Sequence, residues 1–89
     1  MALSTMTREW KEINDSIMRF VIRQKQADEA KLAEKAKNAT GLFNEWVNAY
    51  GVSIRDPELA LWCVEYMQSL VGMPIDRLTS AAKFDGIVI

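Results

Sequence analysis

The stretch Asp56–Gly72, with the sequence DPELALWCVEYMQSLVG, predicts a helix around which the rest of the chain packs. Asp56 marks its start, because this side chain can accept hydrogen bonds from the free N–H groups of a first helical turn. Pro57 suits the first helical position, where no donor is needed. Gly72 marks the end, and we expect it to adopt the left-handed conformation before Pro74 blocks any continuation. Both ends of this central helix are therefore marked in the sequence.

Apolar residues cover most of this central helix. One face repeats at spacings of three and four residues and consists of Leu59, Trp62, Cys63, Tyr66, Met67 and Leu70. Other apolar residues cover much of the remaining surface, and only Glu65, Gln68 and Ser69 form a polar strip. A helix that is apolar nearly all round is typical of a protein interior, so we expect burial on most of its circumference.

A much longer helix is predicted at the start of the chain, with Ser4 or Thr5 suited to cap it. No Gly or Pro follows until Gly41, and apolar residues recur three and four apart at Leu3, Met6, Trp10, Ile13, Ile17 and Phe20. A helix of about 34 residues is about 50 Å long, more than twice the length of the central helix. Part of it should therefore overhang a bundle made by one chain. We expect a second copy to cover this overhang, with Met6, Trp10, Ile13, Ile17 and Phe20 as the interface.

The sequence leaves two possibilities for the end of this long helix. Either one helix runs over about residues 5–50, or the chain breaks within residues 38–41 and Thr40 caps a second helix. We favour a break at Gly41, because a glycine inside a helix is unfavourable by about 1 kcal/mol. Gly51 then ends the second helix.

The C-terminal part of the chain predicts a short helix from about Ile75 to Lys83 that buries Leu78 and Ala82. The apolar tail FDGIVI that follows either docks on the core or pairs with another chain. The expected fold is an all-α bundle of three or four helices with one long N-terminal helix. It forms a single domain over residues 1–89 and is expected to be a homodimer or a higher oligomer.

The composition narrows the class of protein. The chain is 49% hydrophobic and 26% charged, which argues against disorder, and its net charge of −1 does not call for nucleic acid. The one cysteine, Cys63, lies on the apolar face of the central helix, where we expect a buried side chain and no disulfide. The N-terminus lacks a basic start followed by an apolar run. We therefore expect a cytoplasmic protein without a membrane anchor.

Residues suited to catalysis are scarce. The chain has no histidine, and Cys63 therefore has no partner that could activate it as a nucleophile. Glu9, Glu12 and Asp15 follow one another at three-residue steps. This pattern resembles the magnesium-binding carboxylate pairs of the all-helical nucleotide pyrophosphohydrolases. That family has a second pair on another helix, whereas Glu65 here is followed by Tyr66, Met67 and Gln68. We expect a solvated face at these carboxylates, with no metal, cofactor or enzymatic activity.

Two further patterns bear on ligands. The segment WVNAYGVSIRDPEL resembles a helix-turn-helix, but its turn is too long and its second helix offers no side chain that reads base edges. Arg19, Arg23 and Lys25 begin a basic ridge on the first helix that could bind an anion, although acidic residues interrupt the ridge further on.

The sequence favours a non-enzymatic interaction protein, such as a regulator, an inhibitor or an assembly factor. It would bind another protein, of unknown identity, through an apolar helical face and act as a homo-oligomer. The alternative is an oligomer that binds a small anionic ligand or nucleic acid through the basic residues of the first helix. A magnesium-dependent hydrolase is a third, less favoured possibility.

Overall fold

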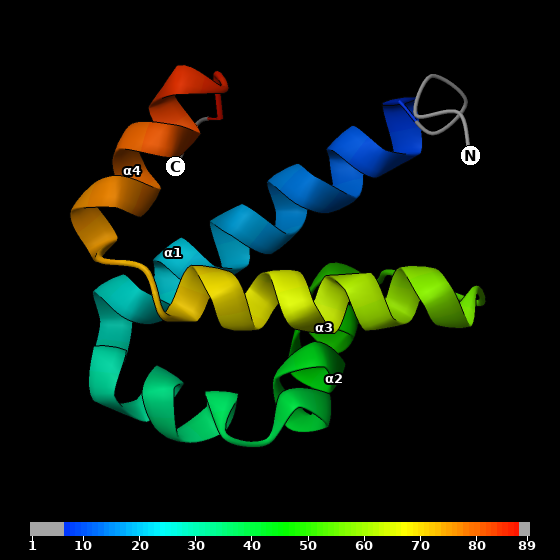
Figure 1. Cartoon of the computed structure of the whole chain (residues 1–89), viewed down its shortest axis with the longest axis horizontal. Helices are drawn as coiled ribbons and strands as arrows, with labels where there is room; N and C mark the ends of the chain where they lie inside the picture. Colours follow the sequence, from blue (N-terminus) through cyan, green and yellow to red (C-terminus); the bar gives the residue numbers. More distant parts are fainter. Residues whose placement is uncertain (1–6, 88–89) are drawn as a thin grey trace.

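The computed structural model describes the backbone of residues 7–87 and the side chains of all of these except residues 7–9 and 39. The described chain is all-helical, as predicted (Figure 1). Its helices are α1 (Thr7–Ala36), α2 (Ala39–Tyr50), α3 (Pro57–Val71) and α4 (Ile75–Phe84). The expected caps Ser4 and Thr5 and the expected apolar residues Leu3 and Met6 lie outside the described residues.

Helix α1 bends sharply at Asp28, which the sequence analysis did not predict. Asp28 leaves the helical conformation, with φ −162° and ψ 94°, and its carboxylate accepts a hydrogen bond from the backbone N–H of Lys31 at 3.0 Å. Asp28 therefore caps a new helical segment that runs in another direction (Figure 1). The longest extent of the molecule is 36 Å, well short of the expected rod. The prediction of a straight overhanging helix is wrong, because the chain folds back at this residue.

The break between α1 and α2 falls within the predicted range, but its details differ from the prediction. Asn38 caps α2, and its side-chain oxygen accepts from the N–H of Gly41 at 3.2 Å. Thr40 was expected as the cap and Gly41 as the break, yet both lie inside the first turn of α2. The side-chain oxygen of an N-cap residue satisfies the free N–H of the third helical residue, so α2 begins directly after Asn38, two residues earlier than a cap at Thr40 would place it.

The ends of α3 agree with the sequence at one terminus and differ at the other. The carboxylate of Asp56 accepts from the N–H of Glu58 at 3.0 Å, so the predicted cap is confirmed. Gly72 was expected to be left-handed, but its φ of −73° and ψ of −10° are right-handed. Pro74 is sufficient to end this helix, because it lacks an N–H group and disfavours the helical conformation for Met73. By contrast, Gly51 ends α2 with φ 62°, as predicted.

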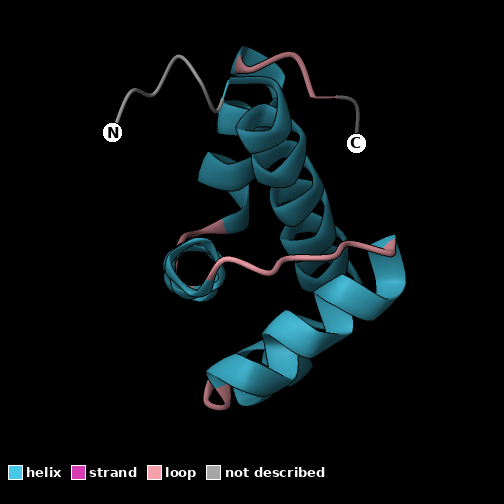
Figure 2. Ribbon diagram, turned by 90° about the vertical axis from the view of Figure 1, so that its right-hand side faces the viewer, coloured by secondary structure: helices cyan, strands magenta, loops and turns pink. Residues whose placement is uncertain are grey.

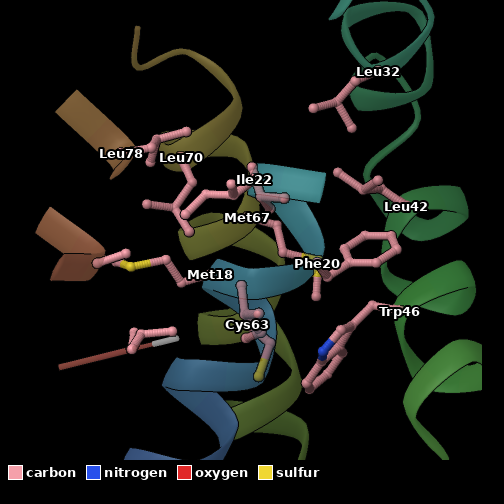
Figure 3. Packing of buried hydrophobic residues seen from close by; sticks show 14 residues of the cluster. Met18, Phe20, Ile22, Leu32, Leu42, Trp46, Cys63, Met67, Leu70 and Leu78 are labelled. Carbon is pink, nitrogen blue, oxygen red and sulfur yellow. The ribbon is translucent and has the colours of Figure 1, made fainter. Parts of the chain in front are cut away.

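The hydrophobic core is built around α1 and not around α3. Helix α1 contacts each of the other three helices, and in Figure 3 its residues lie between Leu42 and Trp46 of α2 on one side and Leu78 of α4 on the other. Helix α1 supplies six buried hydrophobic residues, namely Ile17, Met18, Phe20, Val21, Ile22 and Leu32. Helix α3 supplies only Cys63, Met67 and Leu70, and Leu61 is 59% exposed. The expectation that α3 is buried nearly all round is therefore wrong: its predicted face and Val71 pack against the core, whereas Leu61 faces solvent.

The C-terminal turn docks the start of the tail onto the core. Leu78 and Ala82 are buried, as predicted, and α4 extends one residue past its expected end. Gly86 then adopts φ 80°, and the N–H of Ile87 donates to the carbonyl of Ala82 at 2.8 Å. This left-handed turn brings Ile87 back into the core, where it is 5% exposed.

Candidate binding surfaces

The predicted interface stripe does not form one open surface. Ile17 and Phe20 lie in the core at 0% and 3% exposure, which leaves no surface for a partner. Trp10 and Ile13 are half-buried, and Met6 lies outside the described residues. Of the four members that the structure describes, Trp10 and Ile13 therefore remain available at the surface, and each belongs to a different surface feature.

Trp10 belongs to a row of three aromatic rings, which we call the aromatic strip: Trp10, Trp62 and Tyr66. Trp62 and Tyr66 are four residues apart on α3, so they share a face, and their rings stack with centroids 4.8 Å apart at 16°. Trp10 of α1 continues the row, with its ring centroid 3.9 Å from that of Trp62 at 42°. All three are half-buried. Two helices thus hold a continuous aromatic surface that is partly open to solvent.

One end of the aromatic strip opens into an acidic hollow of about 410 Å³. Its walls are Trp10, Lys11, Asn14 and Asp15 of α1, and Asp85 directly after α4. The pKa of the Tyr66 hydroxyl is raised, first by burial and then by the charges of Asp85 and Asp15, so both carboxylates lie near this ring. No side chain in the described part of the chain forms a salt bridge with either aspartate. The hollow therefore combines an aromatic wall with two carboxylates and a single positive group.

Ile13 lines a second feature, which we call the α1–loop cleft. It measures about 570 Å³, within the range of roughly 300–1,000 Å³ typical of ligand pockets. In Figure 2, α3 is seen end-on and the loop over residues 52–56 crosses to it from α2. The cleft lies between this loop and α1, and its lining residues are Glu12, Ile13, Ser16, Tyr50, Val52, Ser53, Ile54, Arg55, Asp56 and Leu59.

One hydrogen bond fixes the α1 wall of the cleft to α2. The indole Nε1 of Trp46, which is fully buried, donates to Ser16 Oγ at 2.7 Å. This bond satisfies the polar atom of a tryptophan that otherwise packs in the core. This hydrogen bond therefore links the α1 wall of the cleft to α2.

The cleft and the acidic hollow lie on nearly opposite sides of the same half of α1. Glu12 and Ser16 line the cleft, whereas Trp10 and Asn14 line the hollow. The members of each pair are four residues apart and so share one side of the helix. An offset of two residues between the pairs corresponds to about 200° around the helix axis. The predicted carboxylate row Glu9, Glu12 and Asp15 is divided in the same way. Glu12 lines the cleft and Asp15 lines the hollow, while the side chain of Glu9 lies outside the described ones.

The three basic residues that could bind an anion are not presented together. Lys25 is buried at 6% exposure, and its Nζ donates to the backbone carbonyl of Met73 at 2.5 Å. Arg23 is exposed, and Arg19 is half-buried, with its Nε enclosed and without a hydrogen-bond partner in the described part of the chain. Lys25 therefore serves the fold and does not contribute to a surface patch with Arg23.

The groups that could perform chemistry are limited in the described region. Burial raises the pKa of the Cys63 thiol to about 11, so this side chain is protonated and unreactive near neutral pH. Within residues 10–87, no group of three or more histidine, cysteine, aspartate or glutamate side chains is placed to hold a metal ion. Among the described helices, none combines the length and the apolar character needed to cross a lipid bilayer.

No protein-family model, curated protein or solved structure matches this chain. Neither the α1–loop cleft nor the acidic hollow was predicted from the sequence. The signal for the cleft was the pair Val52 and Ile54, apolar residues in a short connection where polar ones are usual. The acidic hollow left no such signal, because Asp85 and Asp15 come from opposite ends of the sequence.

Proposed function

We propose that this protein is a non-enzymatic helical interaction protein that binds a partner protein through the aromatic strip. The observation that carries this proposal is the row of Trp10, Trp62 and Tyr66, half-buried and in contact across two helices. Tryptophan and tyrosine are enriched at the energetic centres of protein interfaces, because rigid rings bury a large area at little cost in conformational entropy. A regulator, an inhibitor or an assembly factor would use such a surface.

The charges beside the strip define the chemistry of the partner segment. Asp15 and Asp85 give the acidic hollow two negative groups against the one positive group of Lys11. A segment that combines apolar side chains with an arginine or a lysine would place its apolar part on the rings and its cation in the hollow. A cation next to a tryptophan face gains further attraction from the ring.

This surface favours protein binding over the anion-binding alternative. An anion would need exposed basic groups that converge, and Lys25 is committed to Met73 inside the fold. We also propose that the protein is a homodimer or a higher homo-oligomer. The exposed phenyl ring of Phe84 supports this part of the proposal, because 91% of its surface faces solvent.

The proposal can be tested by titrating a short peptide of alternating leucine and arginine residues into labelled protein and following the three tryptophan indole N–H signals by NMR. We expect the signals of Trp10 and Trp62 to move, while the signal of Trp46, which is buried against Ser16, stays in place as an internal reference. A matched peptide with glutamate in place of arginine should bind at least about tenfold more weakly.

A pair of variants separates the hollow from general charge attraction. Replacing both hollow carboxylates, in the double variant Asp15→Asn and Asp85→Asn, should weaken binding of the arginine peptide. Asp76→Asn changes an exposed carboxylate in the first turn of α4 and serves as the control, with little effect expected. Movement of all three indole signals together, or equal binding of both peptides, would contradict the proposal.

A further inference from the structure

Phe84 is the most exposed large apolar side chain in the described part of the molecule. It is 91% exposed, and Leu61 follows at 59%. The backbone around it explains this position. The left-handed turn at Gly86 returns the chain so that Ile87, and not Phe84, enters the core. Phe84 is thus held on the last turn of a helix, as a rigidly mounted apolar side chain facing solvent.

The α1–loop cleft has the complementary character. Its apolar lining comes from residues that otherwise pack against the core, including Ile13, Val52, Ile54 and Leu59. Its volume of about 570 Å³ exceeds what one phenyl ring occupies, so the cleft has room for a phenylalanine side chain. The same chain therefore carries an exposed aromatic side chain and an open apolar cleft.

We infer that Phe84 of one copy inserts into the α1–loop cleft of a second copy. A chain cannot fill its own cleft in this way. Asp85, next to Phe84, lines the acidic hollow, and the hollow lies nearly opposite the cleft around α1. The contact therefore joins two unlike surfaces, so it is heterologous and can extend beyond two subunits into a ring or a chain.

The charged groups of the two surfaces are compatible with this pairing. Arg55 and Asp56 line the cleft with opposite charges. Lys83 and Asp85, both exposed, flank Phe84 with opposite charges as well, so no net like-charge repulsion from these groups opposes the contact. The inference rests on the proposed self-association and gives it a specific contact, on a different surface from the aromatic strip.

The test uses two variants that each remove one half of the contact. Phe84→Asp removes the inserted ring, and Ser53→Arg fills the cleft from an exposed loop position, so neither change disturbs the core. The molar mass of the wild type, measured by light scattering, should rise from micromolar to millimolar concentration. Each variant alone should associate about thirtyfold more weakly, as expected for loss of a central interface residue. Leu61→Asp and Ser53→Ala are the controls and should associate like the wild type.

Mixing the two variants distinguishes this contact from any other. Phe84→Asp retains the cleft and Ser53→Arg retains the phenyl ring, so an equimolar mixture should form a one-to-one dimer that cannot grow further. Circular dichroism should show that both variants remain helical. A wild type that stays monomeric, a mixture that stays monomeric, or a Phe84→Asp variant that associates normally would each overturn the inference. The Phe84→Asp variant should still bind the arginine peptide, so this test and that of the aromatic strip can fail separately.

Discussion

The ammonium group of Lys25 donates a hydrogen bond to the backbone carbonyl of Met73, 48 residues further along the chain. This contact ties the middle of α1 to the turn between α3 and α4. The lysine side chain is almost fully buried, and among the described residues it forms a salt bridge with Glu29 alone, whose largely exposed carboxylate is 3.9 Å away. A buried charge is stable only when hydrogen-bonded, so the turn and the lysine depend on each other.

Replacing Lys25 with methionine keeps the aliphatic stem and removes the donor. The carbonyl of Met73 is then left without its partner in a partly buried site, which should lower the free energy of unfolding by about 1–3 kcal/mol. Urea denaturation measures the change. Arg23→Met removes an exposed positive charge two residues away and should change stability by less than about 0.5 kcal/mol. Equal stability of the two variants would show that the Lys25–Met73 hydrogen bond is not important.

The bend in α1 depends on the side chain of Asp28. Asp28→Ala removes the acceptor for the N–H of Lys31 and should cost about 1 kcal/mol of stability. Asp28→Asn keeps an oxygen in the same place and should lower the stability by only a few tenths of a kcal/mol. Thermal unfolding compares the two. If alanine and asparagine behaved alike, the cap would not be what stabilises the bend.

The glycines at the ends of α2 and α3 should respond oppositely to replacement by alanine. Gly51 has φ 62°, and a Cβ there meets no atom within 4 Å, so Gly51→Ala should cost about 1 kcal/mol through backbone strain alone. Gly72 is right-handed, and a Cβ would make only ordinary contacts at 3.7 Å. Gly72→Ala should therefore stabilise by about 0.5 kcal/mol, because the unfolded chain loses freedom. Urea denaturation measures both changes. If the two variants shifted the denaturation midpoint in the same direction, the different roles of Gly51 and Gly72 would be contradicted.

The buried thiol of Cys63 should make stability fall at alkaline pH. In the unfolded chain the thiol loses its proton near pH 8.5, whereas in the folded protein its pKa is raised to about 11. Between these values only the unfolded state is ionised, so the free energy of unfolding should decrease with rising pH, by roughly 3 kcal/mol in total at about 1.4 kcal/mol per unit of pKa. This contribution is fully retained below about pH 8.5.

Cys63→Ala isolates the effect of the thiol from other titrating groups. The pKa of Tyr66 is also raised, but its effect begins only above the ordinary tyrosine value of about 10. From pH 8.5 to about 10, the wild type should lose stability while Cys63→Ala does not, as followed by urea denaturation at each pH. If stability changed with pH in the same way in both proteins, the pKa of the Cys63 thiol would not be raised by folding.

Local signals in the sequence were sufficient for the helices and most of their ends. Asp56, Pro57, Gly51 and Pro74 act within one or two turns, because they satisfy or remove backbone hydrogen bonds of their immediate neighbours. The inward faces of α3 and α4 also followed from spacing, as Met67 and Leu78 show. Asp28 was missed because an acidic residue inside a run of good helix formers carries no local sign that the backbone will bend there.

The amino-acid sequence by itself determined the helical class, most of the helix ends and the inward faces of α3 and α4, since these depend on periodicity and capping over a few residues. Tertiary structure alone decided that α1 is the central helix, that Lys25 reaches Met73, and that Trp10 joins Trp62 at the surface. Each of these relationships joins residues far apart in the chain. Their distance is set by the direction in which the chain leaves Asp28, Asn38 and Gly51, and a pattern of residue types does not encode that direction.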